Sequence, residues 1–277
     1  MSVIHALWLR NLKAFWRNKS ALIFNLVIPF FFVFVFSSIF DGAITMMLAG
    51  IIIATSFDSG LRVSSNTIDD MTGGFMKEVL VSPVSRLQIA LGQFASSATI
   101  GSVQGLLIYL IGLIFFPEIR PDYAWRVLLV IGTMAFVGLI FAGFGLLLAT
   151  KSKNMQTFQA VSMAITMPMT FISGAYIPLS SLPTVLQWVG RFNPLSYAVH
   201  LFRDIAIVSG DETMEFLLAL EQSQIFTFWG IEITPAISTL ILIAFGAIFL
   251  TLSTISFARL DFSKMNRNIM DLVDMWG

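Results

Sequence analysis

The sequence has no cysteine, only two histidines and few charged residues, and each shortage excludes a class of protein. Charged residues are 12% of the 277 residues, against about 25% in soluble domains. Without cysteine there is no thiol nucleophile and no disulfide, and His5 and His200 lie too far apart in sequence to form a metal-binding motif. The formal net charge of +0 gives no electrostatic basis for binding nucleic acid.

Motifs for nucleotide binding and for hydrolysis are also missing. There is no Gly-x-x-x-x-Gly-Lys-Ser/Thr phosphate loop, no HExxH motif and no nucleophile elbow. We therefore predict no catalytic residue, no metal ligand and no cofactor in this chain. An enzyme acting within the membrane has no support in the sequence, and any ATP with its Mg would be bound by another polypeptide.

Apolar residues dominate what is present. They make up 57% of the chain, and the mean hydropathy is +0.85. A membrane span needs roughly 20 apolar residues, and six segments meet that length: 21–40, 43–65, 94–116, 125–150, 155–176 and 233–257. We therefore expect an all-α polytopic membrane protein, with residues 1–277 forming a single transmembrane domain.

The N-terminal residues 1–19 predict an amphipathic helix that lies in the membrane interface. Apolar residues recur there at helical spacing, and basic residues share another face. No apolar core followed by a cleavage site is present, so a cleavable signal is not expected. The alternative is a basic flank to the first span.

Lysine and arginine concentrate in alternate connections, which predicts the orientation. With the N-terminus in the cytoplasm, twelve of the sixteen basic residues fall on the cytoplasmic side. The four that fall outside are Arg120, Arg126, Arg191 and Arg203. We therefore expect both termini to be cytoplasmic.

Residues 66–93 form an amphipathic, partly charged insert between two predicted spans. Asp69 and Asp70 precede a Gly-Gly pair, and a short helix can follow before Ser82-Pro83 ends it. One face of that helix has Phe75, Met76, Val79 and Leu80, and the opposite face has Lys77 and Glu78. A helix tied to a span at each end can transmit a push to both spans, and the alternative is a passive linker on lipid headgroups.

Residues 178–204 contain apolar runs too short to cross a membrane, and prolines break them repeatedly. Non-helical backbone is tolerated at membrane depth only where protein or water covers it. We expect a pair of short re-entrant helices that enter the outer leaflet and return.

Asp58 and Arg62 lie four residues apart in the second predicted span, so they share a helix face. Ionisable residues inside a span are costly and often functional. Two interpretations stay open: the pair lines the transport pathway or an inner gate, or it is an ion pair near the cytoplasmic end that satisfies itself.

Three motifs occur in register with the six predicted spans. Residues 69–86 read Asp-Asp-Met-Thr-Gly-Gly-Phe-Met-Lys-Glu-Val-Leu-Val-Ser-Pro-Val-Ser-Arg, and residues 191–203 begin Arg-Phe-Asn-Pro-Leu-Ser-Tyr and end in Arg. The third is the Trp/Arg-rich N-terminal helix followed by Arg17-Asn18-Lys19. With these motifs the chain resembles, over nearly its whole length, the membrane subunits of type-2 ABC (ABC-2) exporters in the daunorubicin-resistance-like multidrug branch.

The resemblance implies a fold and a function. It implies six membrane helices in a prokaryotic plasma membrane, pairing with a second copy or a paralogue and with two cytoplasmic ABC ATPase subunits. The cargo would be a hydrophobic or amphipathic compound (drug-like, lipid or lipid-linked) exported by alternating access. Residues 75–80 would be the coupling helix, with Asp69 and Asp70 facing the ATPase. The implied outer gate has Pro178, Asn193, Pro194, Tyr197 and Arg203.

An ion-coupled secondary carrier is the alternative of a different class. It would work without an ATPase subunit and would need ionisable residues near the middle of the membrane. Apart from Asp58, the predicted spans are nearly free of them.

Overall fold

The computed structural model of the chain describes residues 3–37, 44–72, 84–115, 124–177, 179–206, 227–228 and 231–260. Nearly all of these residues are helical. The helices are α1 (Val3–Arg17), α2 (Lys19–Ser37), α3 (Ile44–Thr72), α5 (Arg86–Phe115), α6 (Ala124–Lys151), α7 (Met155–Ile172), η2 (Leu179–Ser181), α8 (Thr184–Arg191), α9 (Pro194–Ala206) and α11 (Pro235–Ala258). The strands β1 (Thr227–Phe228) and β2 (Ile231–Glu232) pair antiparallel. The all-α polytopic fold is thus confirmed, with one short β-ladder added.

Among the described residues, four helices are long and apolar enough to cross a membrane, namely α3, α5, α6 and α11. The first predicted span corresponds to α2, whose apolar stretch is shorter, and the fifth corresponds to α7, which has 18 residues. Each predicted span therefore coincides with a helix, and six crossings of the bilayer stay a prediction.

The insert between the second and third predicted spans is shorter than expected, because the helices on both sides extend into it. α3 continues to Thr72 rather than ending at residue 65, and α5 starts at Arg86, eight residues before the third predicted span. Ile68 and Met71 are buried, which stabilises the last turns of α3. At the start of α5, the Ser85 hydroxyl accepts from the Gln88 N–H at 3.3 Å, and Gln88 Oε1 accepts from the Ser85 N–H at 3.1 Å. This reciprocal capping box explains the early start.

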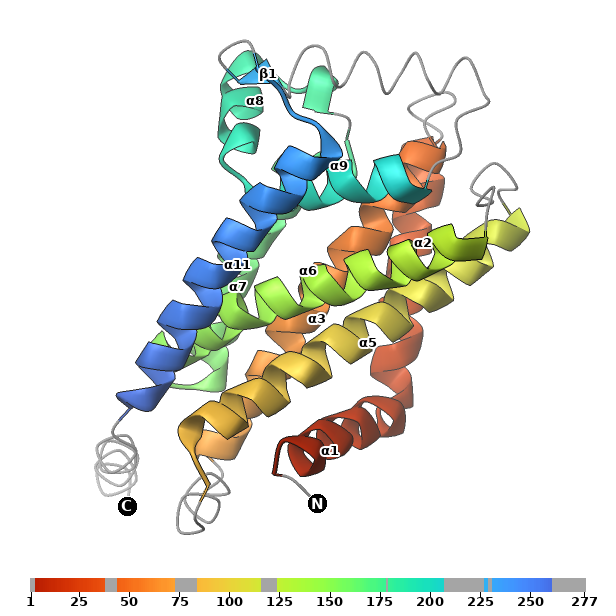
Figure 1. The fold of residues 1–277 in the computed structure, drawn as a ribbon. Coiled ribbons are helices and arrows are strands. Elements are labelled where there is room, and N and C mark those ends of the chain that lie inside the picture. Colours follow the sequence, from red (N-terminus) through yellow and green to blue (C-terminus); the bar gives the residue numbers. More distant parts are fainter. Residues whose placement is uncertain are drawn as a thin grey trace.

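Helix α3 lies at the centre of the bundle, packed against α2, α5, α6, α7 and α9 (Figure 1). Glycine permits its close approach to two neighbours: a Cβ on Gly60 would lie 2.5 Å from the carbonyl carbon of Phe141 in α6, and one on Gly50 would lie 2.4 Å from the Ala175 oxygen. Beside the close approach of α3 to α6, the rings of Phe57 and Phe141 pack edge to face, with centroids 4.6 Å apart. The core therefore depends on small residues facing backbone.

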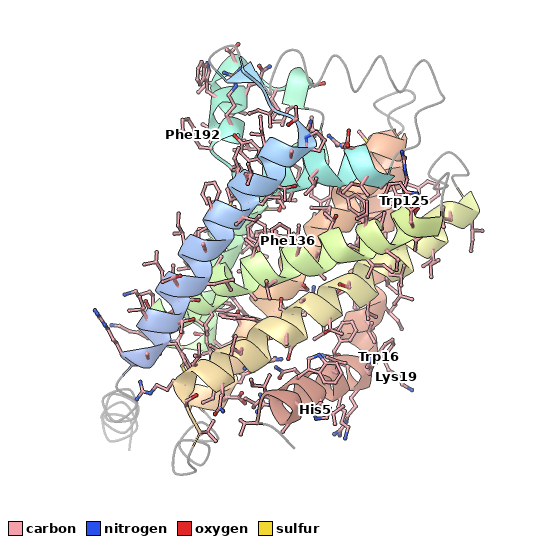
Figure 2. The ribbon with its side chains drawn as sticks, viewed as in Figure 1. His5, Trp16, Lys19, Trp125, Phe136 and Phe192 are labelled. Atoms are coloured by element: carbon pink, nitrogen blue, oxygen red, sulfur yellow. The ribbon has the colours of Figure 1, made fainter. Side chains whose placement is uncertain are left out.

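The two ends of the bundle are covered by different elements. α1 lies across one end, where α11 also finishes, while α8, α9 and β1 lie at the other end (Figure 1). Exposed aromatic residues mark both ends: Trp16 lies beside Lys19 at the α1 end, and Trp125 and Phe192 lie at the α9 end (Figure 2). Aromatic residues at both ends of an apolar bundle are typical of membrane interfaces.

Candidate functional site

A large cavity opens between α2, α3 and α7, with a volume of about 810 Å³. That volume is in the range of sites that hold small molecules. The walls combine aromatic, methionine, hydroxyl and amide side chains with two charged groups. The lining residues include Phe32, Asp58, Leu61, Arg62, Ser65, Gln156, Gln159, Met163, Thr166, Met167, Phe171 and Tyr176.

Asp58 and Arg62 supply both charges of the cavity wall. They share one face of α3, a turn apart, as predicted from their spacing. Among the described residues neither of the two forms an ion pair or a hydrogen bond through its charged group, with each other or with a third residue. Arg62 also lines a second cavity of about 320 Å³ at the junction of α1 and α2. The structure thus places the pair in a cavity rather than in a direct salt bridge.

The cavity wall changes in character along its length. Gln156 and Gln159, in the first turns of α7, lie at the same end as Arg62 and Ser65, near the α1 side of the bundle. Phe171 and Tyr176 line the opposite part, where their rings pack at 5.3 Å between centroids. Tyr176 also packs on Phe32 of α2, at 5.0 Å. The cavity is therefore amphipathic, with one polar end and one aromatic end.

A polar cluster holds α1 to the neighbouring helices. Arg10 of α1 donates two hydrogen bonds to the Asp70 carboxylate of α3, at 3.1 and 2.5 Å. Next to it, the buried Asn11 donates to Gln93 Oε1 at 2.8 Å and to Ser96 Oγ at 3.1 Å, both in α5. The fork-shaped Arg–carboxylate pair fixes geometry as well as charge. α1 is thus bonded to α3 just before residues 73–83.

Arg86 makes a second long-range contact at the same end of the bundle. Its Nη1 donates to the carbonyl oxygens of Phe257, Ala258 and Leu260, at 3.2, 2.6 and 2.7 Å. The last carbonyls of a helix have no partner within the helix, so a cation there is well placed. The residue that follows the insert is therefore bonded to the end of α11.

The predicted coupling residues are only partly within the described ranges. Asp70 forms the ion pair with Arg10, whereas Asp69 is exposed. The predicted helix itself, residues 75–80, lies outside the described residues.

The predicted outer-gate residues gather where α9 meets the end of α7. Arg203 is 2% exposed and donates to the Gly174 oxygen at 2.6 Å, and Asn193 donates to the Met169 oxygen at 2.7 Å. Tyr197 donates to the Arg191 oxygen at 2.6 Å, and Pro194 begins α9 as a buried residue. Pro178 lies outside the described residues. The structure thus brings four of the five predicted residues together.

His200 of α9 lies beside this group and shares a hydrogen bond with the buried Ser238 of α11, at 3.1 Å. Burial, with the nearby positive charge of Arg203, lowers the pKa of His200 to about 4. His200 is therefore neutral at pH 7. No group of His, Asp and Glu that could hold a metal ion occurs in the part of the chain that the structure describes.

Sequence reasoning missed the residues that join the helices at the α1 end, chiefly Arg10, Asn11, Gln93 and the contact of Arg86. One signal was available: Asn11 and Gln93 are amides within apolar stretches, and such amides are usually bonded when buried. The partners of Arg86 lie more than 170 residues away, so no local pattern indicates them.

Comparison with known proteins gives a family and several relatives. The sequence profile described as "ABC-2 type transporter" matches residues 2–207. Nodulation protein J of Rhizobium leguminosarum bv. viciae is 26% identical over 218 residues, covering 72% of this chain and 80% of that protein. "Inner membrane transport permease YadH" of Escherichia coli K12 is 27% identical over 46% of this chain and 48% of its own. "Probable multidrug ABC transporter permease YbhR" of the same strain is 25% identical over 56% of this chain and 39% of its own.

Proposed function

Because this chain belongs to the ABC-2 type transporter family, we propose that it is the membrane-spanning subunit of an ATP-driven exporter. It would pair with a second copy of itself or a paralogue, above two cytoplasmic ABC ATPase subunits that bind ATP and Mg. The complex would lie in a prokaryotic plasma membrane with both termini of this chain in the cytoplasm. It would export a hydrophobic or amphipathic compound by alternating access.

The observation that carries this proposal is the pair of contacts on either side of residues 73–83. Before these residues, Asp70 is bonded to Arg10 of α1. After them, Arg86 is bonded to the end of α11. A displacement of this segment by an ATPase would therefore act directly on α1, α3, α5 and α11. That is the arrangement a coupling segment needs, and a passive linker does not need it.

The cavity between α2, α3 and α7 is the proposed binding site. Its aromatic and methionine walls suit an apolar cargo because methionine adapts to many shapes. Exposed Met163 and Met167 lie on its α7 side. Asp58 and Arg62 would be in the pathway on this proposal.

The contacts between α9 and the end of α7 are the proposed outer gate. Asn193 and Arg203 both bond to carbonyls at or just beyond the end of α7, and α7 also lines the cavity. A change in α7 that opens the cavity to the outside would have to break or move these bonds.

Two of the relatives bear names that agree with the proposal. YbhR is named a multidrug ABC transporter permease, and YadH an inner membrane transport permease. The first name supports export of drug-like compounds, and the second supports the location.

The first test is purification of the full chain from its native membrane, followed by reconstitution with the ATPase that accompanies it. We expect a nucleotide-hydrolysing protein to co-purify and transport to require ATP. Lys77→Glu should lower transport-coupled ATPase activity several-fold, because it reverses charge on the predicted coupling helix. Lys153→Gln, in the connection before α7, is the control and should change nothing.

Transport that follows a proton gradient without ATP would instead support the ion-coupled carrier. Unchanged activity of Lys77→Glu in the assembled complex would show that residues 75–80 are not the coupling helix.

A further inference from the structure

The cavity between α2, α3 and α7 has opposite charges at separate points of its wall. Asp58 and Arg62 are both on α3, one turn apart, so their Cα atoms are separated by about 6 Å along the helix axis. The two groups attract each other across the turn, but in the described part of the chain neither forms a hydrogen bond or a close ion pair, with the other or with a third residue. Asp58 is exposed in this open cavity and Arg62 is half-buried, so both charged groups can be reached by a ligand.

From this we infer that the ligand of the cavity is a zwitterionic amphiphile, with a cationic group that binds Asp58 and an anionic group that binds Arg62. The inference rests on the proposed function and names the class of its cargo. Only a ligand with both charges pairs Asp58 and Arg62 at once and leaves the occupied cavity neutral. A cation would pair with Asp58 but lie one turn from Arg62, an anion would do the reverse, and a neutral ligand would pair with neither.

The cavity wall also predicts the direction in which the ligand lies. Phe32, Phe171 and Tyr176 form the aromatic end and suit an alkyl or aromatic tail. Asp58 lies between that end and Arg62, because α3 runs toward its α1 end in the order Asp58, Arg62, Asp70. The cationic group of the ligand should therefore be the one nearer the tail, and the anionic group the one farther from it.

Four single-chain amphiphiles with the same dodecyl tail test this. The sulfobetaine dodecyl-dimethylammonio-propanesulfonate has its cation next to the tail, and dodecylphosphocholine has the two charges in the reverse order. Dodecyltrimethylammonium and dodecyl sulfate carry one charge each. Binding of each radiolabelled probe, below its micelle concentration, is measured by equilibrium dialysis on the full chain in nanodiscs, with empty nanodiscs subtracted.

We expect the wild-type chain to bind the sulfobetaine about tenfold more tightly than the other three probes, since one additional ion pair in a partly desolvated cavity is worth about that factor. Asp58→Asn and Arg62→Gln should each remove about this factor. The double variant Asp58→Arg with Arg62→Asp keeps the net charge and reverses the order, so it should prefer dodecylphosphocholine.

The matched controls are Asp204→Asn and Arg126→Gln. These two residues attract each other between α9 and α6, away from the cavity lining. Neither substitution should change sulfobetaine binding. Phosphatidylcholine has its phosphate nearer the tails, in the same charge order as dodecylphosphocholine, so nanodiscs of phosphatidylcholine and of phosphatidylglycerol should give the same sulfobetaine binding. Weaker binding in phosphatidylcholine would show that this lipid competes for the cavity and would overturn the inferred charge order.

Equal binding of the four wild-type probes would overturn the inference, and this comparison needs no variant to fold. Unchanged binding in both single variants would overturn it as well. ATP-driven transport by the reconstituted complex is a separate measurement. If ATP-driven transport occurs without a preference for the zwitterion, the ligand class is wrong and the proposed function stands. If the preference occurs without ATP-driven transport, the ligand class stands and the proposed function is wrong.

Discussion

At the α1 end of the bundle the contact between α1 and α3 is a half-exposed pair of charged side chains, whereas at the α9 end a fully buried cation bonds to backbone. The Arg10 side chain is 33% exposed and its Asp70 partner 16%, while Arg203 is 2% exposed. Water can replace a half-exposed partner at little cost, but a buried carbonyl that loses its donor stays unpaired. The contact between Arg10 and Asp70 can therefore rearrange at a lower free-energy cost than the contact between Arg203 and Gly174.

The largest expected effect is at the α9 end. Arg203→Ala should lower the free energy of unfolding by about 3–5 kcal/mol, because it leaves the Gly174 oxygen without this donor and creates a cavity. Thermal unfolding of the purified full chain in detergent measures it. Arg191→Gln is the matched control: Arg191 stacks over Trp188 at 4.3 Å, and its loss should cost about 1 kcal/mol or less. If both variants lose the same stability, full burial of the Arg203 cation does not make its loss more costly than that of the partly buried Arg191.

The next effect is the pH dependence of stability at His200. Its pKa is about 4 in the fold and 6.5 when unperturbed, so the unfolded chain binds the proton more readily. The contribution of neutral His200 is complete above about pH 6.5 and is lost as the pH falls from there to about 4, by on the order of 2–3 kcal/mol. Unfolding is measured across that range for the wild type and for His200→Gln. If the two curves stay parallel, His200 does not titrate as inferred.

A smaller effect is expected where α3 packs closely against α6, between the two ends of the bundle. Gly60→Ala should destabilise the chain by about 1–3 kcal/mol, because the added Cβ would meet the backbone of Phe141 and Ala142 in α6. Gly132→Ala is the control: a Cβ there meets nothing within 4 Å, and alanine is the better helix former, so it should be neutral or slightly stabilising. Unfolding in detergent again measures both, and a tolerated Gly60→Ala would show that α3 and α6 can separate.

The smallest effect on stability is expected for the ion pair between α1 and α3. A double-mutant cycle with Arg10→Gln and Asp70→Asn should give a coupling free energy of about 1 kcal/mol. Each single variant should nevertheless lower transport-coupled ATPase activity of the complex, since the pair borders the proposed coupling segment. The charge-exchanged double variant should recover part of it. If the single variants lose much stability but keep their transport-coupled ATPase activity, the Arg10–Asp70 contact stabilises the fold, as the Arg203 contact does, and has no part in coupling to the ATPase.

The sequence predicted most of the helices because their signals are local. The long apolar runs and the amphipathic helix at residues 1–19 each depend on near neighbours. The end of α3 was misplaced by several residues, since polar residues from Asn66 to Asp70 indicated a loop. Tertiary packing of Ile68 and Met71 and the Arg10 contact keep that segment helical instead.

The candidate site was less accessible from sequence. The spacing of Asp58 and Arg62 predicted a shared helix face. The cavity that this face lines has its other walls on α2 and α7, and these walls depend on packing between distant segments. The same holds for Asn193 and Arg203: the motif identified the residues, whereas their bonds to Met169 and Gly174 required the fold. Contacts between residues far apart in the chain produce no periodic pattern in the sequence.

α3 differs from α2 and α7 in having no proline between Ile44 and Thr72, whereas they contain Pro29 and Pro168. Its 29 residues make a continuous rod about 43 Å long. Because such a rod does not bend at a hinge of its own, a tilt of only about 5° would carry its tips roughly 4 Å relative to each other. A very small rotation of α3 at one membrane surface would thus displace the other end of the helix by about the width of an atom.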